Sequence, residues 1–180
     1  MKLVLVSLVT AIVLSGCIVV STKPDTTKPY KSNVIDFKPT DQISRVETKG
    51  QVICEASKPC PEITFDWKRQ PNNLYKVRAD FYDNEKFDIQ RIVFLIDGQS
   101  YEFNVIGATT QRSVLNAQMI NSSNYIDVPT SFINKFNSAK TIDISIVTEK
   151  GEVSHSILKE DKVSFAYKTF KRGYGQTSNP

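Results

Sequence analysis

An Asp-Gly pair lies between two β-prone runs in the middle of the chain and limits how these runs can be arranged. In residues 91–106 (RIVFLIDGQSYEFNVI), Asp97 and Gly98 separate two segments rich in apolar and aromatic residues. A two-residue Asp-Gly loop is typical of a type I′ turn, whose twist suits an antiparallel hairpin. The spacing lets four apolar side chains share one face: Phe94, Ile96, Tyr101 and Phe103. The sequence therefore predicts a β-hairpin here.

Alternating polarity predicts more strands on both sides of this hairpin. Residues 62–68 (EITFDWK) and 74–82 (LYKVRADFY) place apolar side chains at every second position, which is the period of a half-buried strand. The apolar positions are Ile63, Phe65 and Trp67 in the first run and Tyr75, Val77, Ala79 and Phe81 in the second, with polar and charged residues opposite. Residues 141–148 and 152–158 alternate similarly around a turn at 149–151.

Residues 112–128 predict another hairpin. The polar cluster Asn121-Ser122-Ser123-Asn124 divides this stretch into two β-prone runs, and such clusters favour turns. We therefore expect the chain to reverse at 121–124.

Two helices are predicted near the C-terminus. The first follows Pro129, where Phe132, Ile133 and Phe136 have helical spacing and Asp127 or Thr130 is placed to cap the first turn.

The second predicted helix covers about 160–172, with Gly173 ending it. Its apolar stripe is Val163, Ala166, Tyr167 and Phe170. Together these elements predict an α+β fold that is mainly antiparallel β, either a curved sheet or a small sandwich, with one or two short helices near the C-terminus. The order of elements in this last third is similar to the end of small uncharacterised envelope proteins.

The N-terminus has the layout of an export signal. Lys2 precedes the apolar run 3–14 (LVLVSLVTAIVL), and small residues follow it. The run is shorter than the roughly 20 residues that a membrane-spanning helix needs. We therefore predict a signal peptide at 1–16 and leave it out of the fold.

The end of this signal, Leu14-Ser15-Gly16-Cys17, resembles the lipobox of bacterial lipoproteins. The resemblance implies that Cys17 is lipidated and becomes the mature N-terminus, which anchors the protein to a membrane through acyl chains such as palmitate. The alternative is an ordinary signal peptide with an incidental cysteine. Because Ile18 rather than an aspartate follows the cysteine, the resemblance implies an outer-membrane lipoprotein of a Gram-negative bacterium that faces the periplasm.

The next segment is predicted to be a tether. Residues 17–33 contain Thr-Lys-Pro twice and few large apolar groups after Val20, so they have little to bury. Residues 34–180 are then expected to form a single β-rich domain. The net charge of +4 is modest and does not favour nucleic acid as a partner.

Two further cysteines, Cys54 and Cys60, are predicted to form a local disulfide. An even number of cysteines after export is typical of oxidised pairs, and Pro59 helps the chain turn back between them. The bridge would close a hairpin between residues 51–56 and 62–69. A redox or metal pair is the alternative, but the spacing is not C-x-x-C and no histidine is close in sequence.

No catalytic or metal-binding motif stands out. The single histidine, His155, is expected to face solvent on a strand, because the flanking serines point to the opposite face and cannot reach its ring. Residues 80–85 (DFYDNE) offer oxygen ligands for calcium but lack the EF-hand glycine and spacing, and are better explained as a charged strand end and turn. We therefore expect no catalytic residue, metal or cofactor.

These patterns favour a non-catalytic module that is held at the membrane by Cys17 and binds or assists an envelope protein. An immunity or inhibitor lipoprotein directed at a toxin or a cell-wall hydrolase is the alternative, and a hydrolase is the least favoured class. The candidate binding surface combines two aromatic residues with a basic helix end: Trp67, Tyr75, Lys168, Lys171 and Arg172.

Overall fold

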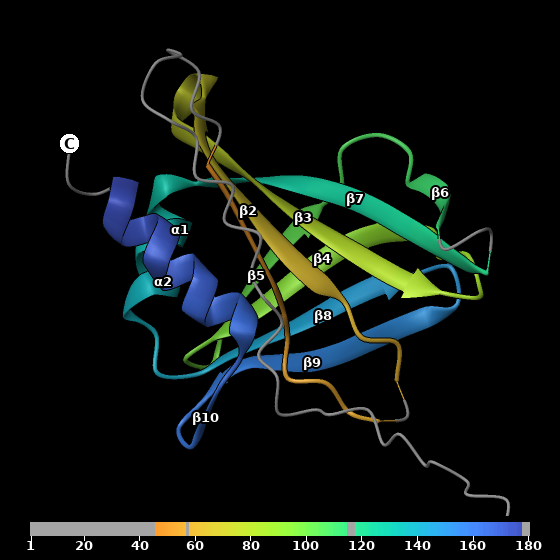
Figure 1. Ribbon diagram of the computed structural model, residues 1–180. Helices are drawn as coiled ribbons and strands as arrows, with labels where there is room; N and C mark the ends of the chain where they lie inside the picture. Colours follow the sequence, from red (N-terminus) through yellow and green to blue (C-terminus); the bar gives the residue numbers. More distant parts are fainter. Residues whose placement is uncertain (1–45, 57, 115–117, 178–180) are drawn as a thin grey trace, which may run out of the picture. The chain divides into compact units, whose positions relative to one another are not determined.

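Two five-stranded antiparallel sheets form the body of the fold (Figure 1). The computed structural model describes residues 46–56, 58–114 and 118–177, all of which belong to one compact unit spanning 32–180. The predicted signal peptide, Cys17 and the tether lie outside the described residues. The mainly antiparallel α+β architecture is confirmed, and the strands form two sheets rather than a single curved one.

The first sheet has the strand order β1-β2-β3-β7-β6. Its strands are β1 (Glu47–Gln51), β2 (Glu62–Gln70), β3 (Leu74–Asp83), β7 (Met119–Pro129) and β6 (Thr110–Val114). A short 3-10 turn, η1 (Pro71–Asn73), joins β2 to β3.

The second sheet has the strand order β10-β9-β8-β4-β5. Its strands are β10 (Lys162–Val163), β9 (Gly151–Lys159), β8 (Ile142–Thr148), β4 (Ile89–Ile96) and β5 (Gln99–Asn104). The chain crosses between the sheets after β3, after β5 and after β7, so each sheet combines strands that are distant in sequence.

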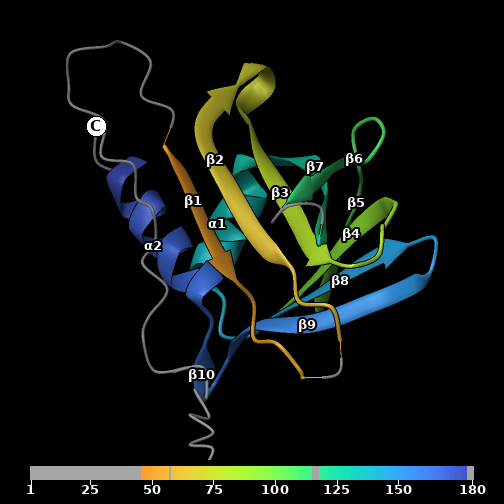
Figure 2. The ribbon, with the colours of Figure 1, turned by 45° about the vertical axis from the view of Figure 1, so that its right-hand side comes forward.

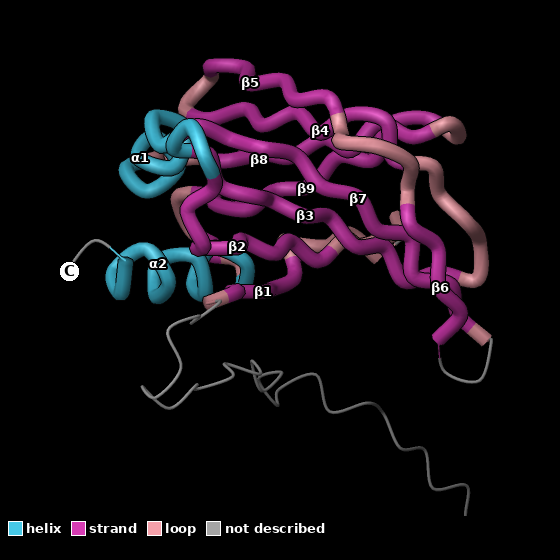
Figure 3. The backbone as a smooth tube through the Cα atoms, turned by 90° about the horizontal axis from the view of Figure 1, so that it is seen from above, coloured by secondary structure: helices cyan, strands magenta, loops and turns pink. Residues whose placement is uncertain are grey.

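Two helices lie at the same end of the strands (Figure 3). They are α1 (Thr130–Ser138) and α2 (Phe165–Thr177). Helix α2 runs beside the edge strand β1 (Figure 2). In the described residues neither helix has the length and apolar character needed to cross a membrane.

The core is aromatic at the helical end. Phe65 of β2 contacts Phe136 of α1 and Phe170 of α2, with ring centroids 5.2 and 4.8 Å away. Phe94 of β4 packs on Phe132 of α1 at 5.1 Å. All five rings are at most 2% exposed. Edge-to-face contacts of this kind add to the free energy gained by burying the rings, so the two sheets and both helices share one core.

The predicted Asp-Gly hairpin is confirmed. Asp97 and Gly98 have φ angles of 49° and 82°, which is the left-handed conformation that a type I′ turn requires. Asp97 Oδ1 also accepts hydrogen bonds from the backbone N–H groups of Thr141 (2.8 Å) and Lys140 (2.9 Å). These bonds, led by that of Thr141, lower the pKa of Asp97.

The predicted turn at 121–124 is wrong, although β6 and β7 do form a hairpin. Residues 121–124 lie inside β7, and the two strands end and begin at Val114 and Met119. The polar side chains have partners across the core: Ser122 Oγ accepts from Phe87 N at 3.0 Å, and Asn124 Nδ2 donates to Gly107 O at 3.3 Å. Buried polar side chains that have hydrogen-bond partners are compatible with a strand. The polar composition of residues 121–124 alone therefore led to the wrong prediction of a turn.

Helix α1 is confirmed, but its predicted caps are wrong. Pro129 is the residue that precedes the first turn, and no side chain caps it. Thr130 Oγ1 instead donates to the carbonyl oxygen of Asn73 at 3.1 Å. Asp127 lies in β7 opposite Lys76. The helix is held by its buried residues Phe132, Ile133 and Phe136, as tertiary packing usually outweighs capping.

Helix α2 begins and ends later than predicted. It continues through Gly173 to Thr177, and Val163 lies in β10 with 43% of its surface exposed. Gly173 faces the indole of Trp67, and a Cβ atom there would overlap the ring and approach Thr48 Cγ2 to 2.9 Å. This glycine therefore permits close packing inside the helix and does not end it.

Candidate functional site

The outer face of the first sheet carries polar side chains at alternate positions. Among the rows that the strand register forms across the sheet, three neighbouring ones matter here. The first row is Thr64, Arg78 and Tyr125. The second row is Glu62, Asp80, Ser123 and Thr110. The third row is Tyr82, Asn121 and Arg112. Side chains directly opposite on adjacent strands are about 5 Å apart at Cβ, so members of a row can contact one another.

Asp80 is the centre of this face. It is only 3% exposed although it points away from the core. Arg78 Nε donates to its Oδ2 at 3.1 Å, and Asn121 Nδ2 lies 3.4 Å from its Oδ1. Arg78 Nη2 also reaches Thr64 Oγ1 at 3.5 Å. A buried carboxylate needs such partners, and in return it fixes the orientation of the Arg78 side chain.

Lys49 of β1 extends the hydrogen-bond network around Asp80 toward the edge of the sheet. Its ammonium pairs with Glu62, donates to Tyr82 Oη at 2.9 Å and lies 4.0 Å from Asp80 Oδ2. Burial alone would lower the pKa of Lys49, but the hydrogen bonds to Glu62 and Tyr82, with the Asp80 charge, raise it. Lys49 is therefore a structural cation with its donors already engaged.

Two adjoining hollows lie over these rows, and we call them together the sheet-face groove. The larger has a volume of about 360 Å³ and is lined from β3, β6 and β7, with Ala108 from the connection before β6. The smaller has a volume of about 210 Å³ and extends toward β1 and β2. Arg78 and Tyr125 line both hollows, so the two hollows adjoin at these side chains.

The larger hollow contains polar groups with spare hydrogen-bonding capacity. Arg112 is exposed, and among the described residues no carboxylate lies within ion-pair distance of its guanidinium. Tyr82 is 38% exposed at the same end. In the smaller hollow, Lys76 Nζ lies 4.4 Å from the ring centroid of Tyr125, a cation–π distance. The groove therefore offers cations, aromatic rings and neutral donors together.

The predicted binding surface is not assembled as expected. Trp67 is only 6% exposed, because it is enclosed between the first sheet and α2 and donates from Nε1 to Thr48 Oγ1 at 2.8 Å. Tyr75 is half-buried against it, with ring centroids 6.2 Å apart. The expectation that Trp67 lies on an exposed surface is therefore wrong, and its role is to hold α2 on the sheet.

The basic residues of that surface all lie on α2. Lys168, Lys171 and Arg172 are exposed. Lys171 Nζ donates to the side-chain oxygen of Asn137 at 2.5 Å and to its carbonyl at 3.3 Å, which ties α2 to the end of α1. Lys171 thus has a structural partner, whereas Lys168 and Arg172 form an exposed basic pair.

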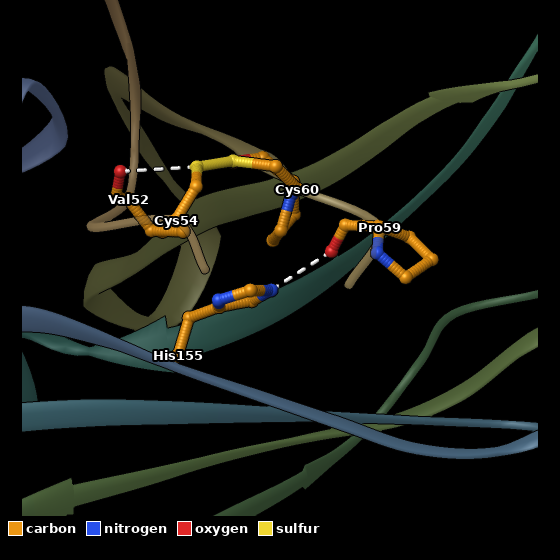
Figure 4. The surroundings of a disulfide bond; sticks show 6 residues. Val52, Cys54, Pro59, Cys60 and His155 are labelled. Carbon is orange, nitrogen blue, oxygen red and sulfur yellow. Dashed lines mark hydrogen bonds between the residues drawn. A yellow bond between two sulfur atoms is a disulfide. The ribbon is translucent and has the colours of Figure 1, made fainter. Parts of the chain in front are cut away.

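The Cys54–Cys60 disulfide is confirmed (Figure 4). It closes the connection between β1 and β2, with the two Cα atoms 5.5 Å apart. The same connection reaches the second sheet, because Ile53 N donates to the carbonyl of Ser156 in β9 at 2.7 Å. The bridge therefore stabilises a loop that links both sheets.

His155 is buried, so the expectation that it faces solvent is wrong. It is 4% exposed on the inner side of β9, and Nε2 lies 2.8 Å from the carbonyl oxygen of Pro59 in the disulfide loop (Figure 4). Because a carbonyl only accepts, Nε2 carries the proton. Nδ1 is buried without a hydrogen-bond partner among the described residues. His155 therefore fastens the disulfide loop to the second sheet.

Residues 80–85 are a strand end and turn, as expected. Asp83 Oδ1 accepts from Glu85 N at 3.2 Å, and Glu85 pairs with Lys150 at 2.6 Å. That hydrogen bond from Lys150 lowers the pKa of Glu85. Within the ranges that the structure describes, no three His, Cys, Asp or Glu side chains are grouped as metal ligands.

Sequence reasoning missed the residues that line the groove, above all Arg78, Arg112, Asn121 and Ser123. The alternation of residues 74–82 does place charged side chains opposite the apolar face of that strand. The remaining signal lies in residues 121–124, whose polar composition is also typical of a turn. No protein-family model, curated protein or solved structure matches this chain.

Proposed function

We propose that this chain is a lipid-anchored envelope protein whose β-rich domain binds another envelope component without transforming it. The anchor is supported by the sequence Leu14-Ser15-Gly16-Cys17, which follows the apolar run 3–14. An acylated Cys17 with two or more chains would hold the protein stably at a membrane, because each buried methylene contributes about 0.8 kcal/mol. Ile18 favours the periplasmic side of an outer membrane.

The disulfide supports the proposal that the domain lies in an oxidising compartment. Cys54 and Cys60 are joined in the structure, and such bonds persist mainly in exported proteins. A signal peptide followed by a stapled domain is consistent with that compartment. The connecting residues 17–33 would give the domain a root-mean-square reach of about 20 Å from the anchor.

One observation carries the binding part of the proposal, the sheet-face groove. It gathers side chains from three strands around Asp80, and the network fixes Arg78 before any ligand arrives. Preorganised polar groups in a concave surface are typical of binding sites. The groove is also far in sequence from the anchor, so binding and anchoring would be separable.

Lipid anchoring is tested by Cys17→Ser in the native host. We expect the wild-type protein to label with palmitate and to fractionate with membranes, and the variant to do neither. Cys54→Ala with Cys60→Ala is the matched control, because it removes the other cysteines and should leave labelling intact. If the Cys17→Ser variant still labels, the anchor is not at this site.

Partner binding is tested by crosslinking intact cells and identifying captured proteins by mass spectrometry. The comparison is between wild type, Arg112→Ala in the groove and Arg91→Ala on the second sheet. A partner lost only with Arg112→Ala supports the proposal. Capture of a toxin or a cell-wall hydrolase would identify an immunity or inhibitor function. Capture that is unchanged in both variants would argue against the groove.

A further inference from the structure

The two arginines of the groove differ in a way that indicates an anionic ligand. Arg78 is held by Asp80 and Thr64, whereas Arg112 on the edge strand β6 has no acidic partner among the described residues. Arg112 lies in the same row as Asn121 and Tyr82. A planar guanidinium presents paired donors that match a carboxylate. Because the guanidinium of Arg112 has no acidic partner within the residues that the structure describes, we expect a ligand carboxylate to bind at Arg112.

Neutral polar groups lie between the two arginines. Ser123 and Thr110 are opposite each other in the register and both line the larger hollow. Asn121 contributes an amide beside them, with its Nδ2 directed at Asp80 and at the carbonyl of Phe81. An apolar ligand would cover these groups without giving them partners, which costs free energy. Ligand hydroxyls can both donate to and accept from them.

The volume of the larger hollow and its aromatic lining further restrict the class of ligand. A volume of about 360 Å³ is at the lower end of the range for small-molecule pockets, which suits one or two sugar rings. Tyr82 and Tyr125 line the hollow, and their rings offer apolar faces beside polar hydroxyls. A sugar ring has the same combination of C–H faces and hydroxyl edges.

We propose that the sheet-face groove binds an acidic saccharide, a sugar that carries a free carboxylate. The carboxylate pairs with Arg112, the hydroxyls bond to Asn121, Ser123 and Thr110, and the ring lies against Tyr82. Arg78 lines the same hollow and stays paired with Asp80, so Arg112 supplies the charge that meets the carboxylate. This inference rests on the proposed binding function, but it does not depend on the lipid anchor.

The test is titration of the purified full-length protein, in mild detergent, by calorimetry. The probes are digalacturonate and N-acetylneuraminate as acidic sugars, maltose as a neutral sugar, and acetate as a carboxylate without a sugar. We expect saturable binding of at least one acidic sugar and clearly weaker binding of maltose and acetate. Arg112→Ala should weaken that binding about tenfold or more, because a hydrogen-bonded charge pair is lost.

Two further variants separate a ligand role from a folding defect. Arg91→Ala removes an exposed arginine that pairs with Glu102 on the second sheet at 3.4 Å, and it should bind as wild type does. Arg112→Lys keeps the charge but loses the paired donors, so its affinity should fall between those of wild type and Arg112→Ala. Thermal unfolding should be similar for all of these exposed-site variants.

The proposal is overturned if neither acidic sugar binds saturably, if maltose or acetate binds as tightly as they do, or if Arg112→Ala and Arg91→Ala behave alike. These outcomes differ from a failure of the proposed function. If no sugar binds but crosslinking captures a partner that depends on Arg112, the groove is a protein-binding site and only the ligand class is wrong. If crosslinking also fails, both proposals fall.

Discussion

The outer faces of the two sheets have the same strand geometry but use their polar side chains differently. On the second sheet, polar side chains pair between adjacent strands: Ser145 with Ser154 at 2.7 Å, Ser156 with Asp143 at 2.5 Å and, diagonally, Arg91 with Glu102. On the first sheet, Asp80 gathers several donors, and Arg112 at the edge has no acidic partner in the described part of the chain.

The contrast between the two faces shows where the capacity to bind a ligand comes from. A face whose cross-strand pairs satisfy each other contributes to stability and has little left to offer a ligand. On the first sheet, the buried carboxylate of Asp80 holds Arg78 in a fixed orientation. Other polar side chains of that face can then form hydrogen bonds to a ligand. Variants on the two faces should therefore differ in stability and in binding.

Removing the Asp80 carboxylate should give the largest difference in stability between variants of the two faces. Asp80→Ala leaves Arg78 and Asn121 without their shared acceptor, so we expect the free energy of unfolding to fall by about 2 to 3 kcal/mol. Asp143→Ala removes one hydroxyl partner on the second sheet and should cost about 1 kcal/mol. Urea unfolding measures both. Equal losses would mean that Asp80 is not the organising group of its face.

The disulfide should stabilise the loop that joins the faces. Replacing Cys54 and Cys60 together by alanine should lower the free energy of unfolding by about 2 kcal/mol, because a closed loop of this size restricts the unfolded chain. Urea unfolding of wild type under oxidising and reducing conditions gives an independent value. The variant should respond equally in both conditions, and a reductant effect on the variant would contradict the assignment.

Gly173 should matter because α2 covers the first sheet. In Gly173→Ala the added methyl overlaps Trp67 and approaches Thr48, and we expect a loss of about 1 to 2 kcal/mol from overpacking. Gly175 lies on the same helix, and a methyl group added there would have no neighbour within 4 Å. Gly175→Ala should therefore be neutral or stabilise by about 0.5 kcal/mol. If thermal unfolding gave the two alanine variants the same stability, close packing at Gly173 would be disproved.

The smallest effects should appear as opposite pH dependences. The pKa of Lys49 is raised in the folded protein, so its contribution is complete below the unfolded value of 10.5 and is lost as the pH rises through the folded pKa. The pKa of Asp97 is lowered, so its contribution is complete above the unfolded value of 3.8 and is lost as the pH falls through the folded pKa.

Thermal unfolding across pH measures both groups. Lys49→Met should flatten the alkaline side of the stability profile, and Asp97→Asn should flatten the acid side. Each variant serves as the control for the other. A variant that changed the wrong side would show that another group dominates there.

Features that depend on neighbours in sequence were predicted well. The Asp97-Gly98 turn, the apolar stripe of α1 and the Cys54–Cys60 bridge all follow from local spacing, and the structure contains each of them. Local chemistry decides turn type and disulfide reach, so a single sequence is sufficient for them.

Features that depend on distant partners were not predicted. Ser122 is accommodated in a strand because Phe87 donates to it, and Gly173 lies inside a helix at the point where Trp67 occupies the space beside it. Arg112 and Arg78 line one hollow only because β6, β7 and β3 are adjacent in the sheet. A sequence shows the alternation of each strand but not which strands become neighbours, so the site appears only with the register.

The disulfide loop also determines how the domain would respond to mechanical load. A pull on the chain before residue 46 enters the domain through β1, which lies at a sheet edge and pairs only with β2. Once β1 detaches, the covalent bond from Cys54 to Cys60 passes the force directly into β2 and bypasses the residues between them. The hydrogen bond between Ile53 and Ser156 lies before Cys54 and is loaded, whereas the contact of Pro59 with His155 lies inside the bypassed loop and would persist after β1 has detached.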